Sequence, residues 1–284
     1  MLVPKPVRTR ILKNTLRKNI CEFYSSLAPE KITDEQKEIL DYLENNPVTI
    51  FPYPFSAGYA PEKTAVFSDP AAGMKFVLQD GKKLYFRRGW SKKRIQRAFA
   101  DLSREQDPLS PHKYLSGDFT LTDNDVAADI GAAEGNFSLA VIERVKKIYL
   151  IEYDPMWIKA LEATFAPWKE KVVIINKYAA GNDDEKHITI DTLINKYSDI
   201  NFLKIDVDGN EQSVLDGATF FLSGTRSMKL AICTYHKEGD EKDFTSILEK
   251  SRFRVNHSRG FMIHYYDKKI KAPYLRRGLL RAVR

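Results

Sequence analysis

Five short apolar runs alternate with helical segments between residues 126 and 250, and this alternation constrains the fold more than any other feature of the chain. The runs are 126–130, 148–152, 172–176, 202–206 and 229–235. Parallel strands need a crossover connection, so the pattern predicts a parallel sheet with helices on both faces. Two further runs, 253–257 and 261–266, predict an antiparallel hairpin at one edge. The expected fold class is α/β, with a mostly parallel, seven-stranded sheet.

The residues before this alternation predict a small α+β region. Thr33 opens a capping box that starts a helix reaching about residue 44. A tight hairpin is expected around Asp80 and Gly81, and Ser91 is placed to cap a further helix that reaches about residue 104. The chain is therefore expected to have three parts: an N-terminal region at 1–117, a sheet domain at 118–267 and a basic tail at 268–284.

The net charge of +7 is unevenly distributed. Residues 1–20 hold six basic and no acidic residues, and residues 268–284 hold seven basic and none acidic. Residues 119–267 hold 18 basic against 24 acidic residues. A nucleic-acid enzyme is expected to carry a basic stripe near its catalytic edge, so no nucleic-acid partner is predicted. The two basic ends are predicted either to be solvated or to hold the protein near an anionic membrane surface.

No apolar stretch approaches the roughly 20 residues that a membrane-spanning helix needs, and the first residues are interrupted by charge and proline. A cytoplasmic protein is expected. The two cysteines, Cys21 and Cys233, cannot form a disulfide framework and have no metal-ligand spacing. The oligomeric state stays open.

A glycine motif follows the first strand of the predicted sheet. Gly131 allows a sharp turn off the strand, and Gly135 is expected to let a ligand approach the next helix. A dinucleotide fingerprint would need glycine where Ala133 and Asn136 stand, which disfavours a NAD(P) oxidoreductase. Glu152 ends the next strand, where a carboxylate can accept hydrogen bonds from two ribose hydroxyls. The motif thus predicts a nucleoside cofactor.

Residues 202–218 read F-L-K-I-D-V-D-G-N-E-Q-S-V-L-D-G-A. This segment resembles the K-I-D-x-[ED]-G-x-E-x-x-[VL]-L-x-G-A signature of FkbM-type methyltransferases. Thr189 to Asp191 is similar to the T-L-D segment of that family, and D-x-G-x-x-x-G at 129–135 to motif I of class I methyltransferases. His236 matches the usual E-x-H ending, whereas residues 231–234 lack its acid. The similarity covers about residues 118–267. Residues 105–114 and 273–278 look like features of one bacterial branch of that family.

The resemblance implies a Rossmann-like class I methyltransferase fold that uses S-adenosylmethionine (SAM). It implies transfer of a methyl group to a hydroxyl of a sugar, glycan or related small molecule. A nucleic-acid (RNA) methyltransferase and a non-catalytic SAM-binding protein are the alternatives. The expected cofactor contacts are Asp129, Gly131, Ala133, Gly135, Asn136, Phe137, Glu152, Tyr178 and Asp206.

His236 is the predicted general base and Asp206 the residue that orients it, because both end adjacent strands of the expected sheet. Segment 105–114 is expected to act as a lid, with Gln106, His112 and Tyr114 as candidate substrate contacts. No metal site is assigned: the acids Asp206, Asp208 and Glu211 are read mainly as the start of a helix, with a divalent cation as the alternative. Basic residues between 87 and 97 are read as a solvated face, with an anionic acceptor as the alternative.

Overall fold

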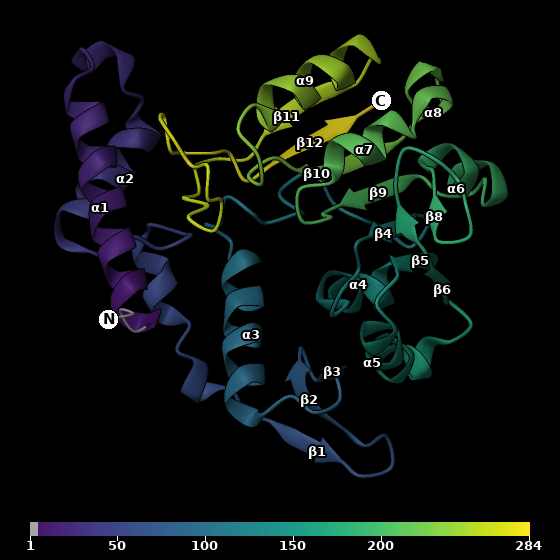
Figure 1. The fold of residues 1–284 in the computed structure, drawn as a ribbon. Coiled ribbons are helices and arrows are strands. Elements are labelled where there is room, and N and C mark those ends of the chain that lie inside the picture. Colours follow the sequence, from purple (N-terminus) through teal and green to yellow (C-terminus); the bar gives the residue numbers. More distant parts are fainter. Residues whose placement is uncertain (1–4) are drawn as a thin grey trace.

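The computed structural model describes residues 5–284, and side-chain burial from residue 9 onward. A seven-stranded sheet forms its centre, with strand order β11-β12-β10-β9-β4-β5-β6 (Figure 1). Five consecutive strands of this order, from β10 to β6, are parallel and coincide with the five apolar runs. They are β4 (Val126–Ile130), β5 (Lys147–Glu152), β6 (Val172–Asn176), β9 (Phe202–Ile205) and β10 (Lys229–Cys233). The predicted α/β class with a mostly parallel sheet is confirmed.

Helices cover both faces of this sheet, and shorter elements connect them (Figure 1). The helices that follow the parallel strands are α4 (Asn136–Val141), α5 (Pro155–Phe165), α6 (Ile190–Lys196), α7 (Glu211–Asp216), α8 (Thr219–Ser223) and α9 (Asp240–Lys250). A two-stranded ribbon joins β7 (Tyr178–Ala179) to β8 (His187–Ile188). Two apolar clusters, one on each face, hold the layers together, and both contain residues from several strands.

The N-terminal region contains three helices and a small antiparallel sheet. Thr33 and Gln36 form the predicted capping box, and Ser91 caps the third helix as expected. The elements are α1 (Lys5–Ser25), α2 (Asp34–Asn45), β1 (Phe67–Asp69), β2 (Met74–Gln79), β3 (Lys82–Tyr85) and α3 (Lys92–Glu105). The predicted basic arm at 1–20 is a helix from residue 5 onward, and it packs through Leu16 and Ile20 into a third apolar cluster. Residues 1–4 of that arm lie outside the described residues.

The antiparallel edge differs from the prediction. Strand β11 (Arg254–His257) pairs with β12 (Leu279–Val283), not with residues 261–266. Strand β12 also pairs with β10, so residues of the predicted basic tail are the second strand of the main sheet. Leu279, Leu280 and Ala282 are fully buried there, whereas Phe261 to Ile263 pack instead into the cluster around α1 and α2. The description of 268–284 as a tail was therefore wrong.

Among the described residues, no helix is both long enough and apolar enough to cross a membrane.

Candidate functional site

A cavity of about 680 Å³ opens at the carboxyl ends of β4, β5 and β9. Open parallel sheets bind ligands at this edge, and the volume is in the range of small-molecule sites. Its walls come from the glycine turn after β4, the end of β5, the end of β9 and one side of α3. Predicted site residues that line it are Tyr114, Gly131, Ala133, Asn136, Glu152, Tyr178 and Asp206.

The two motif glycines serve the packing of the loop. Gly131 has φ +75°, and a Cβ there would lie 2.0 Å from the Asp206 carbonyl oxygen. Gly135 has φ +77°, and its Cβ would lie 2.6 Å from Leu161 and 2.9 Å from Phe165. Both neighbours of Gly135 belong to α5. Gly135 is absent from the cavity wall and is needed for the close approach of this helix, so its contact with a ligand stays a prediction.

Asp129 lies beneath the cavity and not on its wall. Its carboxylate is fully buried, 2.9 Å from the Lys204 ammonium, and accepts a 2.7 Å hydrogen bond from the Ser138 hydroxyl. Lys204 in turn donates to the Gly131 carbonyl at 2.8 Å, so this ion pair supports the glycine turn. Burial works against the Lys204 charge, but Asp129 and Asp206 raise its pKa above the usual value.

Phe137 is also absent from the cavity wall. It is buried against Phe202, with ring centroids 5.9 Å apart. The prediction of direct cofactor contact is therefore corrected for both Asp129 and Phe137. Asp129 instead holds the turn that forms one wall, and Phe137 belongs to the apolar cluster below it.

Glu152 is the best-fixed carboxylate of the cavity. One oxygen accepts hydrogen bonds from the backbone N–H of Tyr153 (2.9 Å) and Asp154 (2.8 Å), and the other from that of Ala133 (3.0 Å). Tyr178 stacks on Tyr153 beside it, with ring centroids 4.1 Å apart. Carboxylate oxygens have further lone pairs, so Glu152 can still accept from a ligand in the cavity. This is the position predicted for ribose recognition.

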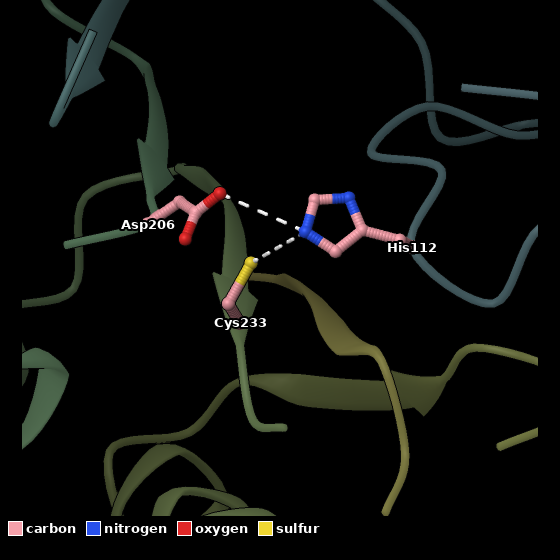
Figure 2. Close-up of side chains that lie close together, drawn as sticks. All are labelled: His112, Asp206 and Cys233. Atoms are coloured by element: carbon pink, nitrogen blue, oxygen red, sulfur yellow. Dashed lines mark hydrogen bonds and ion pairs between the residues drawn. The ribbon is translucent and has the colours of Figure 1, made fainter. Parts of the chain in front are cut away.

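Asp206 and Tyr114 form the opposite side of the cavity. The Tyr114 hydroxyl donates to Asp206 Oδ2 at 2.6 Å, and this contact links the segment before β4 to the end of β9. Burial works against the Asp206 charge, but Lys204 and the nearby histidines lower its pKa to about 2. Burial lowers the pKa of His112, whose side chain is 1% exposed, to about 4. His112 Nε2 faces Asp206 and Cys233 (Figure 2).

His236 is oriented by a residue other than the predicted one. Its Nδ1 lies 3.0 Å from Glu211 Oε1, whereas its Nε2 lies 3.9 Å from the nearest oxygens of Asp206 and Asp208. Burial opposes the imidazolium, but Glu211 and Asp206 raise the pKa of His236 above its ordinary value. The prediction that Asp206 orients His236 was wrong, because Glu211 is the closer carboxylate. His236 lies behind Asp206, which lines the cavity.

Segment 105–114 is a connection that is buried at Ser110, His112 and Tyr114 and exposed at Leu109. Its residues Glu105 and Tyr114 line the main cavity, and the role of the segment as a lid stays a prediction. Arg281 of β12 donates to the carbonyl oxygens of Lys113 (2.6 Å) and Tyr114 (3.0 Å). Gln106 accepts from the Tyr114 N–H and lines a neighbouring cavity of about 460 Å³. His112 is buried at the centre of the segment. Of the three predicted substrate contacts, only Tyr114 lines the main cavity.

Two carboxylates of the cavity wall were not singled out by the sequence analysis. Burial raises the pKa of Glu134, inside the glycine turn, to about 7. Glu105, the last residue of α3, has its pKa raised well above normal by burial and then by Asp206. Glu134 stands between the two motif glycines, which was a usable signal. Glu105 is the first residue of the segment 105–114 that was expected near the cofactor, but no sequence pattern singled out its side chain.

Comparison with known proteins identifies part of this region. A family model described as the methyltransferase FkbM domain matches residues 177–263. No curated protein matches the chain. The match covers the motif at 202–218 and confirms the resemblance drawn from the sequence. Residues 177–263 are thus similar to the methyltransferase FkbM domain.

Similar solved structures include methyltransferase FkbM from Methylobacillus flagellatus KT, with 19% identity and a TM-score of 0.45. That alignment covers 68% of this chain and 53% of the other, so the chain spans about half the length of that structure. TYW2 of M. jannaschii in complex with AdoMet shares 16% identity, with 74% and 85% covered and a TM-score of 0.44. Trm5b from Pyrococcus abyssi shares 12% identity, with 75% and 56% covered and a TM-score of 0.43.

Proposed function

We propose that the protein is a SAM-dependent O-methyltransferase that methylates a hydroxyl of a sugar, a glycan or a related small molecule. One observation carries the proposal: the Glu152 carboxylate, fixed by three backbone N–H groups, faces a cavity of about 680 Å³ beside the glycine turn of β4. The family match over 177–263 supports the reaction class. The hydroxyl acceptor rests on the sequence resemblance.

The residues of the cavity fit SAM. Glu152 would accept the ribose hydroxyls, and the turn from Gly131 to Ala133 would border the amino-acid end of the cofactor. Tyr178 and Asn136 complete this side of the wall. SAM carries a sulfonium and is a net cation. Glu134 adds a carboxyl group to the wall, and the two cations that act on it, Arg87 and Lys204, are paired with Asp154 and Asp129. The acidic wall therefore suits the cofactor's charge.

The chain's own groups can position the acceptor and remove its proton. SAM, when bound, supplies an electrophilic methyl group for in-line transfer. Asp206 lines the cavity and would hold the acceptor hydroxyl, while Tyr114 fixes the carboxylate at 2.6 Å. His236 lies next to Asp206 and Glu211 and does not line the cavity, so the hydroxyl proton would reach His236 Nε2 through Asp206 as the hydroxyl is methylated. Positioning of this kind supplies most of the rate enhancement in such displacements, about 7–11 kcal/mol at best.

Two measurements test the proposal. Calorimetric titration should show binding of SAM and none of NAD. Incubation with methyl-labelled SAM should then label a glycan or small-molecule hydroxyl acceptor and leave RNA unlabelled. Binding of NAD in place of SAM would contradict the cofactor assignment, and labelling of RNA alone would contradict the acceptor class.

A further inference from the structure

Three different ligand atoms converge below the wall of the cavity (Figure 2). His112 belongs to the connection between α3 and β4, Asp206 follows the end of β9, and Cys233 is the last residue of β10. His112 Nε2 lies 3.6 Å from Cys233 Sγ and 3.7 Å from Asp206 Oδ2. The three ligand atoms all lie within 4.8 Å of one another. Segments distant in the sequence thus present nitrogen, oxygen and sulfur at one point.

The side chain of His112 is 1% exposed, and its imidazole makes one hydrogen-bond contact, between Nε2 and Cys233 Sγ at 3.6 Å. Its Nδ1 has no partner among residues 5–284. Its Nε2 points at a sulfur and a carboxylate that are both farther than the roughly 2.7–3.2 Å of a usual N–H···O bond. Buried polar groups nearly always have a partner, so the orphan Nδ1 shows that hydrogen bonds do not fully account for the position of this imidazole. Nε2, and not Nδ1, is the nitrogen that points to the place where the other two groups converge (Figure 2).

We propose that His112 Nε2, Asp206 Oδ2 and Cys233 Sγ bind a Zn²⁺ ion. Zinc bonds of about 2.0–2.3 Å to N, O and S place neighbouring ligand atoms of a tetrahedron roughly 3.3–3.6 Å apart. The separations of 3.6 and 3.7 Å from His112 Nε2 are close to these values, and the ligand atoms of Asp206 and Cys233 lie within 4.8 Å of each other. A set with one imidazole, one carboxylate and one thiolate is typical of borderline-soft ions and disfavours Mg²⁺ or Ca²⁺.

The charges around the three ligands suit a divalent cation. On binding, the Cys233 thiol releases its proton to solvent, so thiolate and carboxylate together balance the ion. The nearest lysine, Lys204, is already neutralised by Asp129 at 2.9 Å. Tyr114 donates to the same Asp206 oxygen at 2.6 Å and would act as an outer-shell partner that fixes the ligand. Asp206 lines the cavity, which gives the ion a route in.

The neighbouring set of Asp206, Glu211 and His236 also holds buried atoms without a hydrogen bond, Glu211 Oε2 and His236 Nδ1, but its other Glu211 oxygen is already engaged. Its Glu211 Oε1 already lies 3.0 Å from His236 Nδ1 and accepts from the N–H groups of Val207 and Gly209. The zinc site would join the connection after α3 to β9 and β10 under the cavity. Its existence is independent of the proposed reaction, because binding of Zn²⁺ is measured without SAM or an acceptor.

The test measures metal directly. Full-length protein stripped with a chelator is titrated with Zn²⁺, and with Co²⁺ as a spectroscopic probe. We expect about one ion per chain and, with Co²⁺, the absorption of a tetrahedral site with a thiolate-to-cobalt charge-transfer band. Cys233→Ala should abolish that band and lower zinc affinity by more than about 100-fold. Tyr114→Phe, which removes only the outer-shell bond, should lower it by roughly 10–100-fold.

Cys21→Ala is the matched control, because Cys21 is the other free cysteine and lies in α1. It should bind Zn²⁺ and Co²⁺ as the wild type does. If Cys233→Ala does not fold, the wild-type Co²⁺ spectrum decides alone. Absence of the charge-transfer band from wild-type protein, or its persistence in a folded Cys233→Ala variant, would overturn the site.

Discussion

Glu134 connects the electrostatics of the cavity to cofactor binding. Burial raises its pKa to about 7, so the side chain is mostly neutral below that pH and mostly ionised above it. A net-cationic cofactor binds the ionised form better, so SAM affinity should rise between pH 6 and 8, with proton release on binding near pH 7. Calorimetry at pH 6 and 8 in buffers of different ionisation enthalpy measures both effects. In Glu134→Gln the part of the pH dependence due to this group should vanish; an unchanged pH dependence would remove Glu134 from the account.

Substitution of His236 should lower the turnover rate and leave SAM affinity nearly unchanged. His236→Ala should lower turnover by about 10²–10⁴-fold, the usual contribution of a general base. SAM affinity should change little, because His236 lies behind Asp206 and does not line the cavity. Steady-state rates and a SAM titration on the same preparation make the comparison. Full turnover in the variant would exclude His236 as the base.

Substitution of Gly135 tests whether this motif glycine is needed for packing of the turn against α5. Gly135→Ala places a Cβ 2.6 Å from Leu161 and keeps φ at +77°, so overpacking and backbone strain should together lower the free energy of unfolding by about 2–4 kcal/mol. Gly58→Ala is the control, since its Cβ meets nothing within 4 Å and its φ is not positive. Urea unfolding compares the two. Equal stabilities would mean that α5 does not pack against the turn as described.

For the secondary-structure elements, the sequence pattern predicted the positions of strands and helices better than it predicted which strands pair. The five parallel strands and the capped starts of α2 and α3 follow from local periodicity and cap residues, which the sequence displays directly. The partner of β11 does not: residues 261–263 and 279–283 are both short apolar runs, and only tertiary packing decides which one joins the sheet. The sequence also did not show that Glu211 is the neighbour of His236. Glu211 begins α7, after β9, and only the tertiary structure brings it to the end of β10.

The segment that leads into β12 is held by an ion pair. Arg276 NH2 lies 2.5 Å from Asp267 Oδ2, and its side chain is 8% exposed. Burial opposes the Asp267 charge, but Arg276 lowers the pKa of Asp267 below its ordinary 3.8. A lowered carboxyl pKa contributes stability that is present above pH 3.8 and is lost as the pH falls through the folded-state value. Acid unfolding of Asp267→Asn should therefore start from lower stability at pH 7 and lose less between pH 5 and 3 than wild type; parallel curves would contradict this.

At the scale of the whole molecule, the two chain ends form one body with the sheet. The Tyr24 hydroxyl of α1 donates to the Pro273 carbonyl at 3.0 Å, and Arg277 lies 2.7 Å from Glu35 of α2. Arg281 and Arg284 donate to backbone carbonyls, so much of the C-terminal positive charge has a structural use that composition alone does not reveal. Membrane-surface association through the basic ends remains a proposal, and it now rests mainly on the exposed face of α1.

The cavity beside Glu152 is proposed to bind SAM. The most direct measurement is a calorimetric titration of SAM into wild-type protein, Glu152→Gln and Glu152→Ala, with thermal unfolding to confirm that each is folded. We predict binding by wild type and a loss of roughly 100-fold or more in Glu152→Ala, since two hydrogen bonds to a charged group, about 1.5 kcal/mol or more each, disappear. Glu152→Gln should lie between them. No binding of SAM by the wild type, or equal affinity in wild type and a folded Glu152→Ala variant, would contradict the account.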